Sequence, residues 1–362
     1  MIQGFWSSFQ TNVPMDMVLY LVILQCVALS WFIQDDTDRE GLQYVLSAQI
    51  ILLVLFWLVY GGYGKDSWDY LTWFDTFFVG NPPTKEWLFW ATGASLSRWV
   101  PHPWSLKILS GLSVAVMCVC ILGFVGRRDR RYAIIGFFVL VLTPSFFLLY
   151  GSAVRQGLAG GIALLGILCL YRGRYMLFIL SVLVGIFLHQ SSVVLSLAGA
   201  LSMLGRKPAI LLLAVSPFAS FIAYHVGLVM GVNIESLVPY ANKSEGQFHW
   251  AKFFMSYAIA VGMLCFAWKR GVKQERVIVA YASMVALSSL FLKFEVPYER
   301  LLLFSDLLLP MAVMAICTQI TLTKRRVYMV WSAALIAGVV LWTHPCITNT
   351  IGYTGNLHGA WR

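Results

Sequence analysis

Long apolar runs alternate with short polar segments along most of the 362-residue chain. A helix needs roughly 20 predominantly apolar residues to cross a bilayer core, and charged or turn-forming residues separate runs of about this length here. The candidate spans are 15–33, 43–61, 104–126, 133–151, 156–171, 175–189, 191–204, 209–226, 252–268, 277–293, 300–320 and 327–343. The pattern predicts an all-α, polytopic membrane protein with about 11–13 transmembrane helices, organised as a single transmembrane domain over residues 1–362.

Composition supports this prediction and narrows the class of protein. Hydrophobic residues make up 59% of the chain, charged residues 12%, and the mean hydropathy is +0.76. These values exclude a water-soluble fold, and the spans leave no room for a separate soluble domain. Seven Cys residues form neither a CxxC pair nor a Cys/His spacing typical of a metal site, so we expect packing roles for them.

The net charge of +10 is better explained by topology than by nucleic acid, because Lys and Arg are scattered between apolar runs rather than gathered on one face. From residue 127 onward, five loops hold fifteen Lys and Arg, whereas the intervening loops from residue 151 onward hold six. The basic loops lie at 127–131, 172–174, 206–207, 269–276 and 324–326. The positive-inside rule places these five loops in the cytoplasm. The first basic residue is Arg39, so the first apolar run lacks the basic start of a cleavable signal peptide and is expected to be retained.

The segments expected to face outward are 62–103, 227–251, 293–300 and the C-terminus after residue 343. The segment 62–103 is too broken for a standard span, because acids and aromatic residues interleave in it. Interfacial helices have this composition, and so do sugar sites, where carboxylates bind hydroxyls and rings cover pyranose faces. We interpret the aromatic residues as an interfacial belt, whereas Asp66 and Glu86 fit a belt less well.

A short hairpin is expected between the basic loops at 172–174 and 206–207, which only about 30 residues separate. Each arm of about 15 residues reaches ~22 Å into a hydrocarbon core ~30 Å thick. The tip, His189-Gln190-Ser191-Ser192, should therefore stop below the outer surface. Polar groups at that depth need surrounding protein or water, which predicts an outward-opening cavity.

Two residues near these spans are candidates for chemistry. Arg155 begins a helix whose first turns contain Gly157, Gly160 and Gly161, so a backbone or a ligand can approach closely. Its guanidinium at a helix N-terminus either binds a phosphate or extends to lipid headgroups. His189 either takes a proton from a sugar hydroxyl, donates a hydrogen bond to phosphate, or is a hydrogen-bonded core histidine.

A third cluster, Lys293 to Arg300, places four charges and a tyrosine between two spans. Arg300 is expected to start the next span, with Asp306 ~9 Å deeper in the membrane. An intramembrane carboxylate indicates either a function or a buried hydrogen bond.

Four short motifs occur in the order found in the EpsG-like, Wzy-type bacterial polysaccharide polymerases, which the chain resembles over about residues 60–310. They are Gly64-Lys65-Asp66 with Tyr70, Glu86-Trp87-Leu88-Phe89, Val154-Arg155-Gln156-Gly157-Leu158-Ala159, and His189-Gln190-Ser191-Ser192. An arginine in the last outer loop, here Arg300, completes the pattern. Lys65 departs from it, because a small or hydroxyl residue is expected at that position.

The resemblance implies a glycosyltransferase of GT-C-like architecture with an outward-facing cavity, in a bacterial inner membrane. Its substrates would be undecaprenyl-diphosphate-linked oligosaccharides, and a growing glycan would move from its carrier onto the next lipid-linked repeat unit. His189 is the favoured general base, with Asp66 next; Arg155, Arg300, Glu86, Tyr70, Gln156 and Glu299 are expected to bind substrate. Arginines can stabilise a diphosphate leaving group without a metal, so we expect no metal and no cofactor. Membrane lipids and a polysaccharide chain-length regulator are the other expected partners. Nucleic acid is not an expected partner.

Other functions remain open at this stage. A flippase or transporter of lipid-linked oligosaccharide would favour internal repeats and charges along a central path, which the sequence lacks. An O-antigen ligase would need a larger outer loop than 227–251, and a membrane acyltransferase would need a basic cytoplasmic motif beside its histidine.

Overall fold

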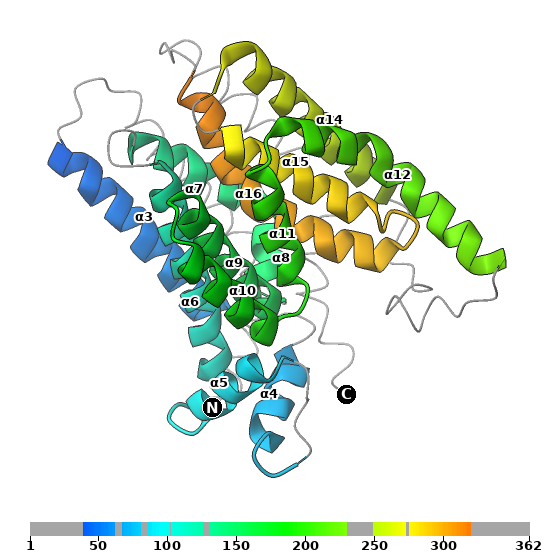
Figure 1. Cartoon of the computed structure of the whole chain (residues 1–362). Helices are drawn as coiled ribbons and strands as arrows, with labels where there is room; N and C mark the ends of the chain where they lie inside the picture. Colours follow the sequence, from blue (N-terminus) through cyan, green and yellow to red (C-terminus); the bar gives the residue numbers. More distant parts are fainter. Residues whose placement is uncertain are drawn as a thin grey trace. The chain divides into compact units, whose positions relative to one another are not determined.

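The computed structural model describes residues 39–61, 67–80, 86–101, 103–125, 130–151, 153–229, 249–272 and 275–319. Within these ranges the chain folds into helices without strands, which confirms the prediction of an all-α polytopic membrane protein (Figure 1). The candidate spans 15–33 and 327–343 and the outer loop at 230–248 lie outside the described residues.

The described chain divides into two compact units, one up to Leu158 and one from Ala159 onward. The first unit contains α3 (Arg39–Tyr60), α4 (Ser67–Thr76), α5 (Trp87–Ser97), α6 (Trp104–Val125), the 3-10 turn η1 (Arg130–Tyr132), α7 (Ala133–Leu142), α8 (Pro144–Gly151) and the start of α9 (Val154–Tyr171). The second contains the rest of α9, α10 (Tyr175–Leu188), α11 (Ser192–Ser202), α12 (Arg206–Val229), α14 (His249–Arg270), α15 (Glu275–Ser289) and α16 (Glu295–Cys317). Whether the chain works as a single transmembrane domain stays a prediction.

In the first unit, α6 is the central helix and packs against α3, α5 and α8. Trp57 of α3 contacts two aromatic rings of α8, with centroid distances of 5.4 Å to Phe146 and 5.9 Å to Tyr150. The Ser110 hydroxyl of α6 donates to the backbone carbonyl of Tyr150. These contacts hold α8 against α3 and α6. Helix α8 precedes α9 in the chain, so they also help to position the start of α9.

In the second unit, α15 is surrounded by its neighbours α11, α12, α14 and α16 (Figure 1). Every residue from Val277 to Ser289 is buried, as expected for a helix that is apolar on all sides. Its alanines and serines allow the neighbouring backbones to approach closely, which is how helices associate where lipid replaces water.

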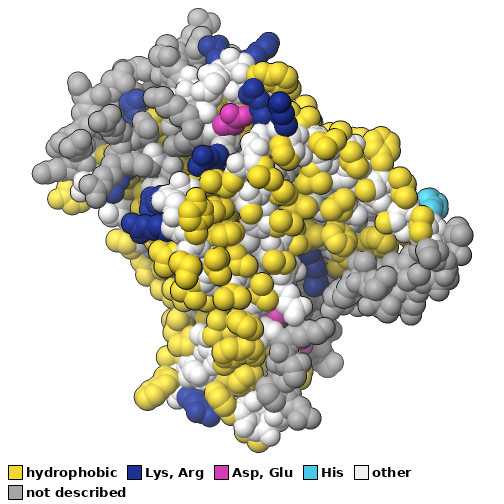
Figure 2. Space-filling model, viewed as in Figure 1, with side chains coloured by type: hydrophobic (Ala, Val, Ile, Leu, Met, Phe, Trp, Pro, Cys, Tyr) yellow, Lys and Arg dark blue, Asp and Glu magenta, His cyan; other side chains and the backbone are white. Residues whose placement is uncertain are grey.

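Five of the described helices are long and apolar enough to cross a membrane: Gly41–Val59, Trp104–Val125, Val154–Tyr171, Arg206–Val226 and Val296–Cys317. In the first and fourth, only 22% of the most apolar window is buried, so most of their surface is available to lipid. Hydrophobic side chains also cover much of the surface visible in Figure 2, as expected for a protein surrounded by lipid.

Three predicted spans differ from the structure in their boundaries. The run 133–151 forms two helices, α7 and α8, because Pro144 forces the preceding Thr143 into an extended conformation with ψ 121°. The run 277–293 is a helix only to Ser289 and then turns. Arg300 was expected to start a helix, and this prediction is wrong. Helix α16 already begins at Glu295, and Arg300 lies in its second turn.

Candidate functional site

The structure divides the predicted site residues between the two units. Tyr70, Glu86, Arg155 and Gln156 belong to the first unit, and His189, Glu299 and Arg300 to the second. Asp66 lies outside the described residues, as do Gly64 and Lys65.

An ion pair between Arg155 and Glu86 is the centre of the site in the first unit. The Nη1 atom of Arg155, at the start of α9, lies 2.6 Å from Oε2 of Glu86, which directly precedes α5. The side chains are 24% and 12% exposed, so the pair is half-buried but not sealed. A charge-assisted hydrogen bond of this length in a partly desolvated place is stronger than a surface pair.

Glu86, whose carboxylate pairs with Arg155, has a strained backbone conformation. Its φ of 60° makes it the only non-glycine residue with positive φ among the described residues. The side chain makes no capping bond to α5, although Glu86 occupies the N-cap position. A non-glycine residue in the left-handed region costs about 1–2 kcal/mol, and such strain is typical of functional sites.

Aromatic rings form a wall beside the Arg155 guanidinium. Its Cζ lies 5.1 Å from the ring centroid of Trp90 and 5.8 Å from that of Tyr70, within the range of a cation–π interaction. The two rings lie 5.7 Å apart and are 5% and 3% exposed. We call Arg155, Glu86, Trp90 and Tyr70 the arginine clasp.

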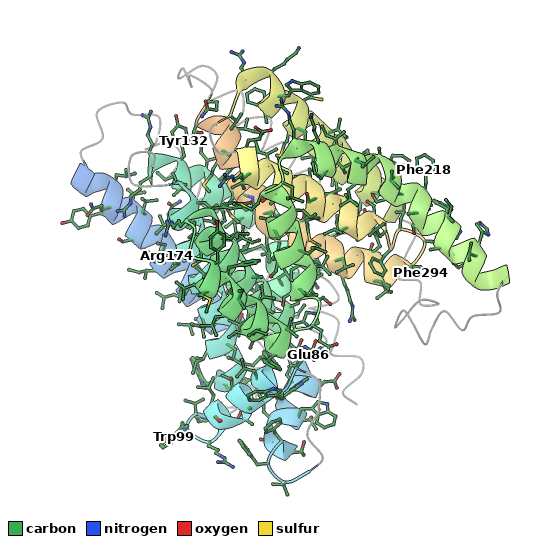
Figure 3. All side chains as sticks on the ribbon, in the orientation of Figure 1. Glu86, Trp99, Tyr132, Arg174, Phe218 and Phe294 are labelled. Atoms are coloured by element: carbon green, nitrogen blue, oxygen red, sulfur yellow. The ribbon has the colours of Figure 1, made fainter. Side chains whose placement is uncertain are left out.

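The buried rings correct the interpretation of segment 62–103 as an interfacial belt. Tyr70 and Phe74 of α4 pack against Phe89 and Trp90 of α5, with centroid distances of 5.3–6.1 Å. Trp73 and Phe78, which are 41% and 49% exposed, still fit a belt. The described part of the segment therefore forms two short helices, α4 and α5, that support the clasp, and its position at the outer interface stays a prediction. Figure 3 labels Glu86 beside these helices.

Close backbone packing fixes the place of Arg155. A Cβ atom on Gly157 would lie 2.7 Å from the carbonyl oxygen of Leu149 in α8 and 3.2 Å from Ser113 Oγ in α6. The prediction that the first turns of this helix allow another backbone to approach is thus confirmed at Gly157. The adjacent Gln156 is only 5% exposed, so among the residues of this turn Arg155 is the one accessible to a ligand.

The chemistry of the clasp is suited to an oxyanion. Arg155 has five N–H donors, and its contact with Glu86 leaves donors for a second anion. The indole N–H of Trp90 is buried and has no acceptor among the residues that the structure describes, and buried N–H groups normally have one. The N-terminal end of α9 adds a positive dipole. Each of these features favours an anionic oxygen, such as that of a phosphate, as its partner.

His189 lies at the tip of the predicted hairpin in the second unit. Helices α10 and α11 have 14 and 11 residues, so their lengths are ~21 Å and ~17 Å at 1.5 Å per residue. The backbone N–H of His189 donates to Gly185 at 2.7 Å, and its carbonyl accepts from Ser192 at 3.0 Å. The predicted short hairpin is confirmed, and it leaves the imidazole half-buried at the turn. The depth of this tip in a membrane stays a prediction.

The remaining two predicted residues lie on α16. Glu299 accepts a hydrogen bond from Lys252 Nζ of α14 at 2.6 Å, a partner that the sequence did not indicate. Arg300, the next residue, is exposed. No group of three or more His, Cys, Asp or Glu suited to a metal occurs among the described residues.

Sequence reasoning missed Trp90. It lies in the first turn of α5, directly after the motif Glu86-Trp87-Leu88-Phe89 that had already been singled out. Its place directly after that motif was the available signal.

Fold and clasp together define a polytopic, all-α membrane protein with a partly accessible arginine–carboxylate pair against aromatic rings. The chain belongs to the EpsG family, whose model matches residues 42–353. This family is associated with polysaccharide biosynthesis and with polymerase-type glycosyltransferase activity. No curated protein and no solved structure matches the chain.

Proposed function

We propose that the protein is a polysaccharide polymerase that uses undecaprenyl-diphosphate-linked oligosaccharides at the outer face of a bacterial inner membrane. The observation that carries the proposal is the arginine clasp. It unites three of the four motifs by which the sequence resembles the EpsG-like polymerases, because Tyr70, Glu86 and Arg155 come from different motifs. Membership of the EpsG family supports the same class of activity.

The reaction transfers a glycan between two lipid carriers. A hydroxyl oxygen of the acceptor sugar attacks the anomeric carbon of the donor glycan and forms the new glycosidic bond. The bond from that carbon to the phosphate oxygen breaks, and undecaprenyl diphosphate leaves with the electron pair. Its developing negative charge is stabilised by Arg155, without a metal. In this proposal the chain forms one transmembrane domain of GT-C-like architecture, and a polysaccharide chain-length regulator is its protein partner.

The proton of the acceptor hydroxyl needs a base. We propose His189 first, since its imidazole is half-buried at the end of a short hairpin, and Asp66 second. Arg300 and Glu299 are proposed to bind substrate, and the Lys252 contact holds the Glu299 carboxylate in one orientation. Tyr70 of the clasp and Gln156, the buried neighbour of Arg155 in the chain, are proposed to support substrate binding through the position of Arg155.

The proposed function is tested by elongation in liposomes. The protein is reconstituted with a lipid-linked repeat unit, and the products are separated by size. A ladder of longer glycans on the lipid carrier is expected. Movement of the repeat unit across the bilayer without elongation would show a flippase and refute the polymerase.

Replacing Glu86 with glutamine should lower the elongation rate about 10- to 100-fold. The substitution keeps the size of the side chain but removes the charge that holds Arg155, so the guanidinium becomes less well positioned. In a double-mutant cycle with Arg155→Ala, the two losses should not add, because both remove one interaction. Additive losses would show that Glu86 acts independently of Arg155.

Comparing Glu86→Gly with Glu86→Ala separates the effect of backbone strain at residue 86 from the effect of losing the Glu86 carboxylate. Both variants lack the carboxylate and should be equally slow. Glycine accepts the φ of 60°, so Glu86→Gly should be about 1 kcal/mol more stable than Glu86→Ala in unfolding measurements.

Gly157→Ala is expected to lower the elongation rate at least tenfold. The added Cβ would meet a backbone oxygen at 2.7 Å, which cannot move aside like a side chain, so the start of α9 shifts together with Arg155. The matched control is Gly262→Ala in α14, where no atom lies within 4 Å of the added Cβ. The control should keep its rate and gain slightly in stability. Equal rates for both variants would contradict the close packing at Gly157.

A further inference from the structure

One end of the second unit carries three short turns, and each contains a glycine with positive φ. These are Gly173 after α9, Gly205 after α11 and Gly271 after α14, with φ of 73°, 87° and 60°. No atom lies within 4 Å of a Cβ built on any of them. Each glycine ends its helix abruptly, so the basic residues beside it are fixed close to the helix ends.

Specific contacts hold these turns together. The hydroxyl of Tyr171 lies 2.7 Å from Ser202 Oγ and donates to the backbone carbonyl of Arg276 at 3.0 Å, which joins the ends of α9, α11 and α15. Nη1 of Arg206 lies 3.6 Å from Oε1 of Glu275, and its guanidinium lies 4.9 Å from the ring centroid of Trp268. The three turns therefore form one continuous surface with a defined arrangement.

This surface is strongly positive. We call it the basic face, and it consists of Arg172, Arg174, Arg206, Lys207, Lys269, Arg270 and Arg276. Glu275 is the only acid among the described residues of these turns, and it is already paired with Arg206. Six of the seven cations are exposed, and Arg206 is partly exposed. In the upper part of Figure 2, Lys and Arg side chains gather beside an acidic one.

Large apolar side chains stand exposed directly beside these cations. Leu204 is 68% exposed, Trp268 62%, Tyr175 59% and Met176 80%. A surface for an acidic soluble protein would not need apolar side chains at its rim. On this surface, cations lie within one or two residues of exposed apolar and aromatic side chains. This arrangement is complementary to a phospholipid, in which a charged headgroup is joined to acyl chains.

We propose that the basic face binds the headgroups of anionic phospholipids. The sequence places these same turns on the cytoplasmic side, where anionic lipids attract basic residues next to membrane helices. A zwitterionic headgroup carries no net charge and would bind weakly. The proposal is independent of the polymerase function, because it uses neither the arginine clasp nor the chemistry of glycan transfer.

The test measures lipid binding by the purified full-length protein. Phosphatidylglycerol or phosphatidylcholine is added in mixed micelles, and bound lipids are counted by native mass spectrometry, with the melting temperature as a second readout. Phosphatidylglycerol should bind at least tenfold more tightly. Each basic residue near a membrane surface contributes about fivefold, so removing two should weaken this binding roughly 10- to 30-fold.

Two independent double variants remove charge from the basic face: Lys269→Gln with Arg270→Gln, and Arg172→Gln with Arg174→Gln. The control double, Arg98→Gln with Lys293→Gln, removes two exposed cations from segments predicted to face outward. Both basic-face doubles should lose selective binding, the control should keep it, and high salt should weaken it in the wild type. Equal binding of the two lipids by the wild type, or an equal effect of all three doubles, would overturn the proposal.

Discussion

Replacing Arg155 with alanine should reduce glycan elongation about 100- to 1,000-fold. The guanidinium is the cation that offsets the negative charge on the departing diphosphate, and removing one such donor from an active site typically has an effect of this size. The variant also leaves the half-buried Glu86 carboxylate without the partner at 2.6 Å, which would turn the clasp from neutral overall to anionic. The measurement is the initial rate of ladder formation in liposomes.

Arg98→Ala is the matched control for Arg155→Ala. Arg98 follows α5 in the same unit and also lies over an aromatic ring, with its Cζ 3.9 Å from the centroid of Phe78. It has no carboxylate partner among the described residues, and its side chain is exposed. Its removal should leave the rate unchanged. If both variants lose activity equally, the loss reflects cation–π packing in general and not the clasp.

Replacing His189 with alanine should also lower elongation strongly, by about 10²- to 10⁴-fold, the usual contribution of a positioned general base. The backbone bonds to Gly185 and Ser192 that shape the hairpin do not involve the imidazole, so the fold should survive. The measurement is the initial rate of ladder formation in liposomes, with the melting temperature as a check on folding.

His225→Ala is the control for His189→Ala. His225 lies on α12, is exposed, and contacts the ring of Tyr224 at a centroid distance of 5.6 Å. Its removal should leave the rate unchanged. If His189→Ala retains the wild-type rate, the base is another residue, and Asp66 becomes the first to replace.

The periodicity of the sequence predicted the helices where hydrophobicity alone decides them. Helix α6 runs from Trp104 to Val125 against a predicted 104–126, and the short hairpin of α10 and α11 followed from the spacing of basic loops. The break between α7 and α8 was missed because the apolar run 133–151 continues through it, although Pro144 gave a local signal. The start of α16 was placed too late, since the charged residues Glu295 to Arg300 were interpreted as a loop and are helical.

The site was predictable by residue but not by arrangement. Arg155 and Glu86 were selected separately, one for its place at a helix start and the other because an acid fitted an aromatic belt poorly. Their pairing depends on α5 and the start of α9 meeting in space, and residues so far apart in sequence give no periodic signal for such a contact. The left-handed backbone of Glu86 was likewise not predictable, because glutamate rarely adopts it.

The central claim is that the arginine clasp binds the diphosphate of the lipid carrier, and direct binding tests it most simply. An isoprenoid diphosphate is titrated into the purified full-length protein by calorimetry, with wild type, Arg155→Ala and Arg98→Ala compared side by side. We predict saturable binding to the wild type and to Arg98→Ala, and at least 100-fold weaker binding to Arg155→Ala. Equal affinity of Arg155→Ala and the wild type would contradict the claim.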